Sequence, residues 1–310
     1  MPSIDLASSA LAPGVSPVRV DYRDAGAGRP IVILHGGWGY DMYPFDRQIA
    51  ALAATHRIVA PDRTGYGRFR RVERQETDFH HRAAAETFAV IAALGLERPV
   101  VWGHSDGAVI ALLMGLSNPD RLGGLIVEAA HFFRRKPRSQ EFFETMMCDP
   151  DGLGERVTGV LLREHGAGWR DLIRTNGDAW LRIATDPSAP ADDLYGGRLA
   201  DLRVPTLVIH GARDPRTEPG ELEAMWDALA RTHGSAPTTA PDGSVTATLD
   251  AGADRRVGPA LLAILPEGGH SPHSERATAD AVTREAERFV RERAFAPPDL
   301  APPPALGDWR

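Results

Sequence analysis

Short apolar runs alternate with longer amphipathic stretches along most of this chain, and no other feature of the sequence restricts the possible folds as strongly. Short runs that are apolar on both faces are typical of strands covered by helices on each side of a parallel sheet. The stretches between them carry apolar residues at helical spacing, which is typical of crossover helices. The pattern therefore predicts an α/β fold with a mostly parallel central sheet and helices on both faces.

The predicted elements follow one another closely. The expected strands span residues 18–22, 30–34, 57–60, 99–102, 124–127, 206–209 and 260–265. The expected helices span residues 79–96, 108–116, 221–231 and about 277–295. Because strands and helices alternate without an internal repeat, one layered core is expected rather than a repeat array.

Two segments break this alternation. Residues 131–197 contain several helical patterns separated by turns such as CDPDG and DPSAP. We expect them to form a helical cap over the sheet, inserted into a core made of residues 1–130 and 198–295. Residues 232–258 are small, polar and rich in turn residues, and predict a surface loop or hairpin with SVTATL as its one strand-like piece. The Pro-rich residues 296–310 predict an extended or disordered tail.

The composition excludes several classes of protein. A formal net charge of -7 and a pI near 5.9 argue against a nucleic-acid binder or a binder of anionic membranes, because both need a positive field over the contact surface. The single Cys148 excludes a disulfide scaffold, and no long apolar stretch predicts a membrane span or a signal peptide. We therefore expect a cytoplasmic protein. Of the 35 Lys and Arg residues only Lys136 is lysine, which suggests GC-rich codon usage and a bacterial source.

The sequence GHSDG, residues 103–107, lies between the apolar run PVVW and a predicted helix. A nucleophile on a tight strand-to-helix turn needs small neighbours, and Gly103 and Gly107 meet this requirement. The helix that follows directs backbone N–H groups and the positive end of its dipole toward an oxyanion beside Ser105. The pattern predicts Ser105 as a nucleophile, and the alternative is an ordinary Gly-rich turn.

A serine hydroxyl needs a base, and the base needs a carboxylate that orients it, in the order Ser, acid, His for this type of turn. Asp214 follows the run TLVI in the turn GARDP, and His270 follows the last run in PEGGH. We predict Asp214 as the acid and His270 as the base. Glu128, at the end of GLIV, is a second candidate for the acid, and His273 is a second candidate for the base. Otherwise Glu128 is expected to line the substrate pocket.

An oxyanion needs at least two hydrogen-bond donors. The backbone N–H of Asp106, which follows the nucleophile, is the first expected donor. HGGWG, residues 35–39, directly follows the run PIVIL, and its glycines allow a close approach of the backbone, so Gly37 is the second expected donor. Trp38 is expected to form a wall of the substrate pocket, with plain packing as the alternative.

The motifs HGGWG, PDRTGYGR, GHSDG, GARDP and EGGH, in this order, resemble those of the α/β-hydrolase family over about residues 18–290. The sequence SDG at the turn, a helical cap and PEGGHSPH near the end together resemble the valacyclovir hydrolase (biphenyl hydrolase-like) branch. The resemblance implies Ser105 as nucleophile, His270 as base and Asp214 as its partner. The chain departs from the family at Phe69, where a Ser is usual, and in the interval of 270 minus 214, or 56, residues between acid and base, which is longer than usual.

The side chain of Asp106 has two interpretations. In the valacyclovir hydrolase branch, the Asp after the nucleophile is associated with recognition of a substrate α-ammonium group, so the resemblance implies the same role for Asp106. In a poorly solvated pocket such a charge-assisted bond is worth about 1.5 to 3 kcal/mol. The alternative is that the carboxylate caps the helix that follows.

No metal and no cofactor are expected. The 11 histidines show neither the spacing HExxH nor a Cys/His metal pattern, and no nucleotide-binding glycine motif is present. The basic cluster formed by Arg134, Arg135, Lys136 and Arg138 begins the predicted cap. These side chains could bind a carboxylate of the substrate, or they could lie on a solvated face.

Together these residues predict a serine hydrolase that cleaves a small-molecule carboxylic ester, with α-amino acid esters as one candidate class, through an acyl-Ser105 intermediate. Because Ser rather than Asp occupies the turn, an alkyl-enzyme route as in haloalkane dehalogenases or epoxide hydrolases is not expected. A C–C bond hydrolase, a lactonase or a proline iminopeptidase-like peptidase could use the same residues, and a ligand-binding protein without turnover is the alternative from another class. The expected partner is a small-molecule substrate, and the cap leaves apolar surface for a homodimer.

Overall fold

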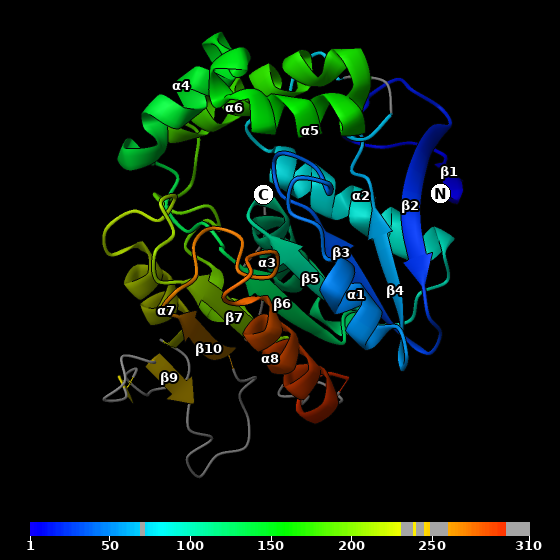
Figure 1. Ribbon diagram of the computed structural model, residues 1–310, viewed down its shortest axis with the longest axis vertical. Helices are drawn as coiled ribbons and strands as arrows, with labels where there is room; N and C mark the ends of the chain where they lie inside the picture. Colours follow the sequence, from blue (N-terminus) through cyan, green and yellow to red (C-terminus); the bar gives the residue numbers. More distant parts are fainter. Residues whose placement is uncertain (69–71, 231–237, 240–244, 249–259, 296–310) are drawn as a thin grey trace.

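The computed structural model describes residues 1–68, 72–230, 238–239, 245–248 and 260–295 (Figure 1). In this part of the chain one sheet runs in the order β1-β2-β4-β3-β5-β6-β7-β10-β9-β8. Its strands are β1 (Ser3–Leu6), β2 (Val18–Ala25), β3 (Arg29–Leu34), β4 (His56–Pro61), β5 (Val100–His104), β6 (Gly124–Glu128), β7 (Thr206–Gly211), β8 (Thr238–Thr239), β9 (Val245–Thr248) and β10 (Ala260–Leu265). In this order, each strand from β4 through β3, β5, β6 and β7 to β10 is parallel to its neighbour. The pairs β1 with β2, β2 with β4, β10 with β9 and β9 with β8 are antiparallel and form the two edges. The predicted mostly parallel sheet is confirmed.

Helices cover both faces of the sheet because its central strands have no polar face. Along β3, Ile31 and Ile33 belong to the apolar core on one face, and Val32 and Leu34 belong to the core on the other. The helices on the Val32 face are α2 (Phe79–Ala93), α3 (Asp106–Ser117) and α7 (Glu221–Ala230), and those on the Ile31 face are α1 (Asp46–Leu52) and α8 (Ala279–Glu292). The predicted layering is therefore confirmed.

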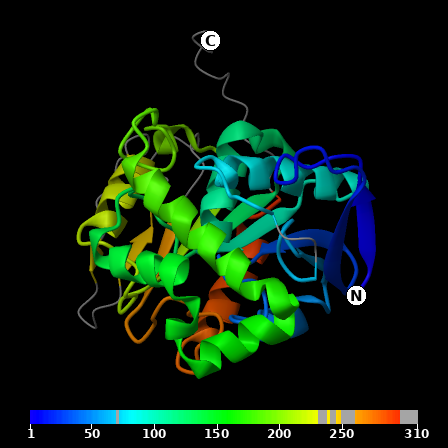
Figure 2. The ribbon, with the colours of Figure 1, turned by 90° about the horizontal axis from the view of Figure 1, so that it is seen from above.

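A further group of helices lies above the sheet, over the carboxyl ends of its parallel strands, and crosses it when seen from above (Figures 1 and 2). These helices are α4 (Gln140–Cys148), α5 (Glu155–His165) and α6 (Trp169–Thr185), within the segment predicted as a cap. Short 3₁₀ helices are η1 (Pro119–Arg121), η2 (Pro137–Ser139), η3 (Pro150–Leu153), η4 (Gly166–Gly168) and η5 (Leu199–Asp201). These helices share a small apolar core around Trp169 and Trp180, to which Met42, from the loop after β3, also belongs.

Glu164, on α5, ties this upper layer to the loop that follows β3. Its carboxylate accepts hydrogen bonds from the backbone N–H groups of Tyr40, at 2.7 Å, and Asp41, at 3.0 Å. Burial raises the pKa of Glu164 to about 8, and the nearby charge of Asp41 adds to this effect. The contact between α5 and the loop therefore depends on a group that titrates near neutral pH.

The structure differs from the sequence prediction mainly in short elements and at helix ends. β1 and α1 were not predicted, because elements of four and seven residues are too short to show a period. α2 ends at Ala93, earlier than predicted, because Gly95 leaves the helical region with a φ of +61°. The strand-like piece in residues 232–258 forms β9, which pairs with β10. Most of that segment, Phe69 and the tail 296–310 lie outside the described residues.

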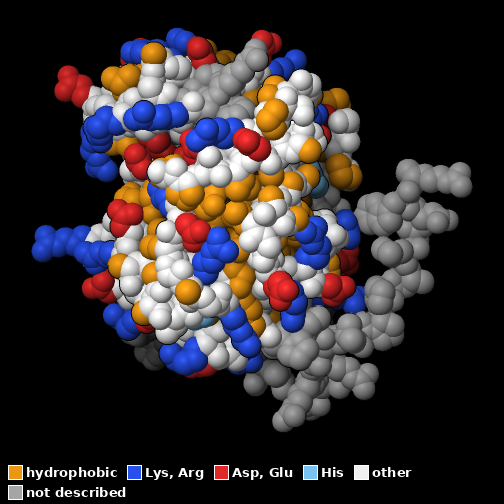
Figure 3. Space-filling view, turned by 90° about the vertical axis from the view of Figure 1, so that its right-hand side faces the viewer, with side chains coloured by type: hydrophobic (Ala, Val, Ile, Leu, Met, Phe, Trp, Pro, Cys, Tyr) orange, Lys and Arg blue, Asp and Glu red, His pale blue; other side chains and the backbone are white. Residues whose placement is uncertain are grey.

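The side of the molecule next to β1 and β2 shows mixed surface chemistry (Figure 3). Hydrophobic side chains gather beneath the upper lobe, and basic and acidic side chains are interspersed around them. Within the described part of the chain, no helix combines the length and the apolar character needed to cross a membrane.

Candidate active site

The sequence GHSDG forms a tight turn between β5 and α3. Ser105 has a φ of 54° and a ψ of -119°, which residues other than glycine rarely adopt. A Cβ atom on Gly103 would lie 2.0 Å from the carbonyl oxygen of Gly107, and one on Gly107 would lie 2.1 Å from the carbonyl oxygen of Leu34. Both glycines are thus sterically required, as the sequence predicted, and the strained turn fixes Ser105 where the sheet meets the cap.

Ser105, His270 and Asp214 come together from three separate segments. The distance from His270 Nε2 to Ser105 Oγ is 3.1 Å, and His270 Nδ1 lies 3.0 and 2.9 Å from the two oxygens of Asp214. Because an ionised carboxylate only accepts hydrogen bonds, Nδ1 carries a proton and Nε2 faces the serine hydroxyl with its lone pair. The side chain of Asp214 is 1% exposed and that of His270 is 18% exposed. The arrangement can therefore remove a proton from Ser105 while excluding most solvent.

The charge of Asp214 is stabilised from several directions. Burial alone would raise its pKa, but the charge and hydrogen bond of His270, together with His210 and the backbone N–H of Arg216, hold the pKa of Asp214 well below its usual range. Asp214 is therefore ionised at neutral pH and orients the imidazole of His270.

His104, in the turn beside Ser105, holds the loop that carries His270. Its Nε2 donates to the carbonyl oxygen of His270 at 2.9 Å and lies 3.0 Å from Ser271 Oγ. Burial lowers the pKa of His104 to about 3, and the nearby His273 and His270 contribute to this shift. His104 is thus a neutral, fixed donor. No role for it was predicted, because the contact depends on a segment 166 residues later in the chain.

The loop of residues 35–39 lies directly against this turn. A Cβ atom on Gly36 would lie 3.1 Å from Ser105 Cβ, and one on Gly37 would lie 3.0 Å from Asp106 Oδ2. Neither the N–H of Gly37 nor that of Asp106 donates a hydrogen bond to another group in the described part of the chain. The structure therefore brings the two predicted oxyanion donors together beside Ser105, each with its N–H available.

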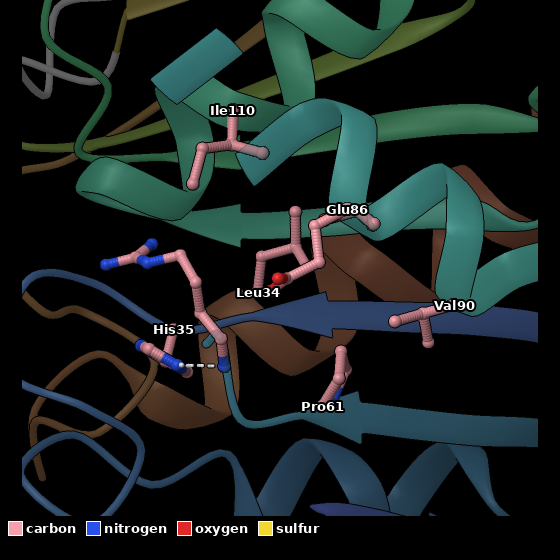
Figure 4. Close-up of a pocket in the computed structure, with 8 residues that line it drawn as sticks. Leu34, His35, Pro61, Glu86, Val90 and Ile110 are labelled. Carbon is pink, nitrogen blue, oxygen red and sulfur yellow. Dashed lines mark hydrogen bonds between the residues drawn. The ribbon is translucent and has the colours of Figure 1, made fainter. Parts of the chain in front are cut away.

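His35 joins this loop to the segment that follows β4 through hydrogen bonds of its ring. Its Nε2 accepts the backbone N–H of Arg63 at 3.2 Å (Figure 4), and its Nδ1 donates to the carbonyl oxygen of Gly36, whose atoms are not drawn in that view, at 2.8 Å. Burial and the neighbouring Arg63 lower the pKa of His35 well below its usual value, so the ring is neutral. A cavity of about 20 Å³ lies beside it, lined by Leu34, Glu86 and Ile110 among others. It has room for about one water molecule and is too small for a substrate.

The carboxylate of Asp106 is occupied by protein groups. Oδ1 lies 3.1 Å from Trp180 Nε1 and 3.3 Å from His80 Nε2, whereas Oδ2 accepts from Asn176 Nδ2 at 3.2 Å. Arg63 adds an ion pair at 3.6 Å, and the Asp106 side chain is 2% exposed. Burial opposes its ionisation, but His80 and Arg63 lower the pKa of Asp106 well below its usual range. The expected binding of a substrate amine by this side chain is therefore wrong for this structure, and so is the alternative of helix capping. The carboxylate instead joins the cap to the turn.

Glu128 is also not a pocket residue. Its side chain and that of His273 are both 0% exposed and pair with each other, with His273 Nδ1 at 2.7 Å and the His273 backbone N–H at 2.9 Å from Glu128 Oε1. His273 Nε2 faces the carbonyl oxygen of Tyr43 at 2.9 Å. The expectation that Glu128 lines the pocket is wrong because this carboxylate is buried and bonded to His273, in the segment that follows His270. Since Glu128 and His273 pair with each other, the alternatives of Glu128 as the catalytic acid and of His273 as the base are wrong as well.

The basic cluster has a structural role as well. Lys136 is buried and forms an ion pair with Glu221, and Arg134 donates to the backbone carbonyl oxygens of Ile183, Asp186 and Ala191. Arg138 donates to the carbonyl oxygen of Thr217. Lys136 thus joins the predicted cap to the core, and Arg134 joins two segments within the cap, so neither side chain is available to a substrate carboxylate.

Two side chains near Ser105 were not predicted in this role. His131 Nε2 lies 3.4 Å from Ser105 Oγ, and the ring of His131 is stacked on that of His270 with centroids 5.8 Å apart. Burial lowers the pKa of His131 well below its usual value, so it is neutral. Trp180 lies edge-on to His131 at 5.2 Å. From the sequence, both residues were assigned only to the predicted cap. Their closeness to Ser105 depends on how the cap packs on the core, which the sequence does not show.

Trp38, in the loop of residues 35–39, is half-buried, and its ring lies 5.4 Å from that of Phe142 on α4. This position is compatible with the predicted pocket wall, which stays a prediction. No group of three or more His, Cys, Asp or Glu side chains among the described residues is arranged to hold a metal ion.

Comparison with known proteins identifies the class to which this fold and site belong. Residues 31–284 match the model of the alpha/beta hydrolase family, and the chain belongs to this family. A non-heme haloperoxidase of Rhodococcus erythropolis is 40% identical over 223 residues, which cover 62% of this chain and 77% of that protein. A 2-hydroxy-6-oxononadienedioate/2-hydroxy-6-oxononatrienedioate hydrolase of Paraburkholderia phymatum is 27% identical over 244 residues, covering 69% of this chain and 81% of that protein. A solved thermophilic esterase from Thermogutta terrifontis superposes with a TM-score of 0.64 at 20% identity, covering 95% of this chain and 100% of its own.

Proposed function

We propose that this protein is a serine hydrolase that cleaves a small-molecule carboxylic ester through an acyl-Ser105 intermediate. The observation that carries the proposal is the continuous hydrogen-bonded line from Asp214 through His270 to Ser105, with distances of 2.9 and 3.1 Å, on a strained turn. This geometry is that of an activated serine nucleophile with its base and orienting acid. The relatives are hydrolases in most cases, which supports hydrolysis and leaves the bond type open.

The proposed first half-reaction forms the acyl-enzyme. His270 Nε2 takes the proton of Ser105 Oγ as this oxygen bonds to the carbonyl carbon of the ester. The N–H groups of Gly37 and Asp106 stabilise the negative oxygen of the tetrahedral intermediate. The C–O bond to the alcohol then breaks, and the protonated His270 gives its proton to the leaving alkoxide. Asp214 keeps the ring oriented and stabilises its positive form.

The second half-reaction releases the acid. A water molecule takes the place of the alcohol, and His270 removes its proton as the water oxygen bonds to the acyl carbon. The bond from that carbon to Ser105 Oγ breaks, and Oγ recovers its proton from His270. Each removed donor of the oxyanion hole is worth about 10² to 10³ in rate in enzymes of this type.

Labelling with a fluorophosphonate probe, followed by intact-mass spectrometry, tests the nucleophile. We expect one adduct on the wild type and none on Ser105→Ala or His270→Ala. Ser274→Ala is the matched control, because the Ser274 hydroxyl donates only to the carbonyl oxygen of Ser271 and should keep the adduct. A correctly folded wild type that forms no adduct would contradict the proposal and favour a ligand-binding protein without turnover.

A substrate panel then tests the bond type. Acyl esters, lactones, aminoacyl amides and vinylogous diketones distinguish an esterase from the lactonase, peptidase and C–C hydrolase alternatives. We expect the acyl esters to give the largest kcat/KM. A larger value for another class would replace the ester assignment while leaving Ser105 as the nucleophile.

A further inference from the structure

We propose that Arg216 forms a binding site for a carboxylate group of the substrate, at the junction of α4 with the loops that follow β3 and β7. This proposal rests on the proposed hydrolysis at Ser105 and narrows its substrate class to esters that also carry an acid group. Arg216 was assigned no role from the sequence, because nothing in GARDPRTEP distinguishes its arginines.

The position of Arg216 is fixed beside the site. It follows Asp214 by two residues, and its backbone N–H donates to Asp214 Oδ1 at 2.8 Å. Its guanidinium lies 3.5 Å from the centroid of the Phe142 ring on α4. Arg216 is half-buried, yet its guanidinium forms no hydrogen bond and no ion pair with any side chain or carbonyl group in the described part of the chain.

This lack of a partner separates Arg216 from its neighbours. Arg213, on the same loop, is paired with Glu267 and is largely exposed. Arg134 and Arg138 donate to backbone carbonyl oxygens, as described above. The carboxylate of Asp214, two residues earlier, is already bonded to His270 and to the Arg216 backbone. An acidic ligand would supply this guanidinium with a hydrogen-bond acceptor.

Aromatic contacts connect Arg216 with the nucleophile. The ring of Phe142 lies 5.4 Å from that of Trp38, Trp38 is stacked on Tyr43 at 6.3 Å, and Tyr43 lies 5.5 Å from His104, the neighbour of Ser105. Trp38, Tyr43 and Phe142 are each half-buried, as is Arg216. A series of ring contacts therefore connects the guanidinium of Arg216 with the turn that carries Ser105.

The chemistry of these side chains defines the ligand. A guanidinium stacked on a ring keeps the N–H groups of its edge free, and their planar fork matches a carboxylate. Burial lowers the pKa of Arg216, opposed by Asp214 and Tyr43, but an arginine in this setting remains charged. The ligand that fits is an acyl chain with the scissile ester at one end, a carboxylate at the other and an apolar or conjugated middle that packs on the rings.

The test compares two matched series of p-nitrophenyl esters. One series consists of monoesters of unbranched dicarboxylic acids of increasing length, and the other consists of unbranched fatty acid esters of equal length. We expect the wild type to favour the acidic ester at one chain length, and Arg216→Gln to lower the ratio of the two kcat/KM values by about tenfold to a hundredfold. Arg213→Gln is the matched control and should keep the ratio. High salt should reduce the preference of the wild type, because screening weakens exposed charge pairs.

Each outcome decides the proposal. If the ratio is the same in the wild type and in Arg216→Gln, Arg216 only holds α4 and the proposal is wrong. Calorimetric titration with the free dicarboxylates separates this result from a failure of the proposed hydrolysis. If the wild type cleaves no ester but binds a dicarboxylate at least about tenfold more tightly than Arg216→Gln, the carboxylate site stands and the hydrolase assignment falls.

Discussion

Replacing Asp106 by Asn tests whether the carboxylate beside the nucleophile is a structural charge or a substrate-binding group. The amide keeps the shape but removes the charge, and its NH₂ group must face donors. At Oδ1 these are Trp180 and His80, and at Oδ2 they are Asn176 and Arg63. Breaking a buried ion pair by removing one partner typically costs about 3 to 5 kcal/mol. Since contributions within one network are not additive, we expect the free energy of unfolding to fall by about that amount.

The assay is urea unfolding together with ester kinetics. Because the pKa of Asp106 is lowered in the folded state, its stabilisation is complete above the ordinary Asp pKa and is lost as the pH falls through the folded value. The difference in the free energy of unfolding between wild type and Asp106→Asn should therefore be largest at neutral pH and become smaller in acid. Asp178→Asn is the matched control on α6, since its exposed pair with Arg182 is worth at most about 1 kcal/mol. Adding Arg63→Met to Asp106→Asn should recover part of the loss.

Two results would refute this reasoning. A loss of less than about 1 kcal/mol would mean that the carboxylate is not a buried charge on which the fold depends. A variant of normal stability that loses activity about tenfold more on an alanyl ester than on a propionyl ester would restore the amine-binding role.

Three further predictions concern other carboxylates. Asp214→Asn should lower kcat/KM by about 10⁴-fold at neutral pH, because the orienting charge on His270 is lost, and a fall of less than about tenfold in steady-state assays would contradict this. Glu128→Gln should lower the free energy of unfolding in urea by about 3 to 5 kcal/mol, since it breaks the fully buried pair with His273, and an unchanged midpoint would exclude a structural role. Glu164→Gln should flatten the decline of Tm with rising pH. The raised pKa of Glu164, about 8, means that the folded state holds a proton that the unfolded state has released, so wild-type stability falls up to that pH, and parallel Tm curves would argue against this assignment.

Much of the fold was predictable because the relevant signals are local. Residues 30–34 are apolar on both faces, and a strand with that pattern has to lie between two helical layers. The position of Ser105 was predictable for a similar reason, since a Cβ atom on either glycine of GHSDG would lie about 2 Å from a backbone oxygen. Asp214 and His270 were predictable as partners of Ser105 because both come after strands of the parallel sheet, and the carboxyl ends of such strands lie at the same edge.

The environment of the site was not predictable in the same way. Whether Glu128 and Asp106 face a ligand or the protein depends on contacts such as His273 with Glu128 and Asn176 with Asp106, which join segments 145 and 70 residues apart. The charge pattern also suggested that Lys136 was available to a substrate. Its partner Glu221 is 85 residues away in the sequence, so the ion pair could not be predicted. Pairing over such distances follows from the packing of the cap on the core, and a single sequence carries no local trace of it.

The contact between α6 and Asp106 has a consequence for how molecules reach Ser105. If α6 rose like a hinged lid, Asn176 and Trp180 would leave the carboxylate, and a buried charge would be stranded beside the nucleophile. The contacts of Asn176 and Trp180 with Asp106 therefore oppose a lifting of α6, and we expect this helix to keep its position while a molecule binds beside Ser105.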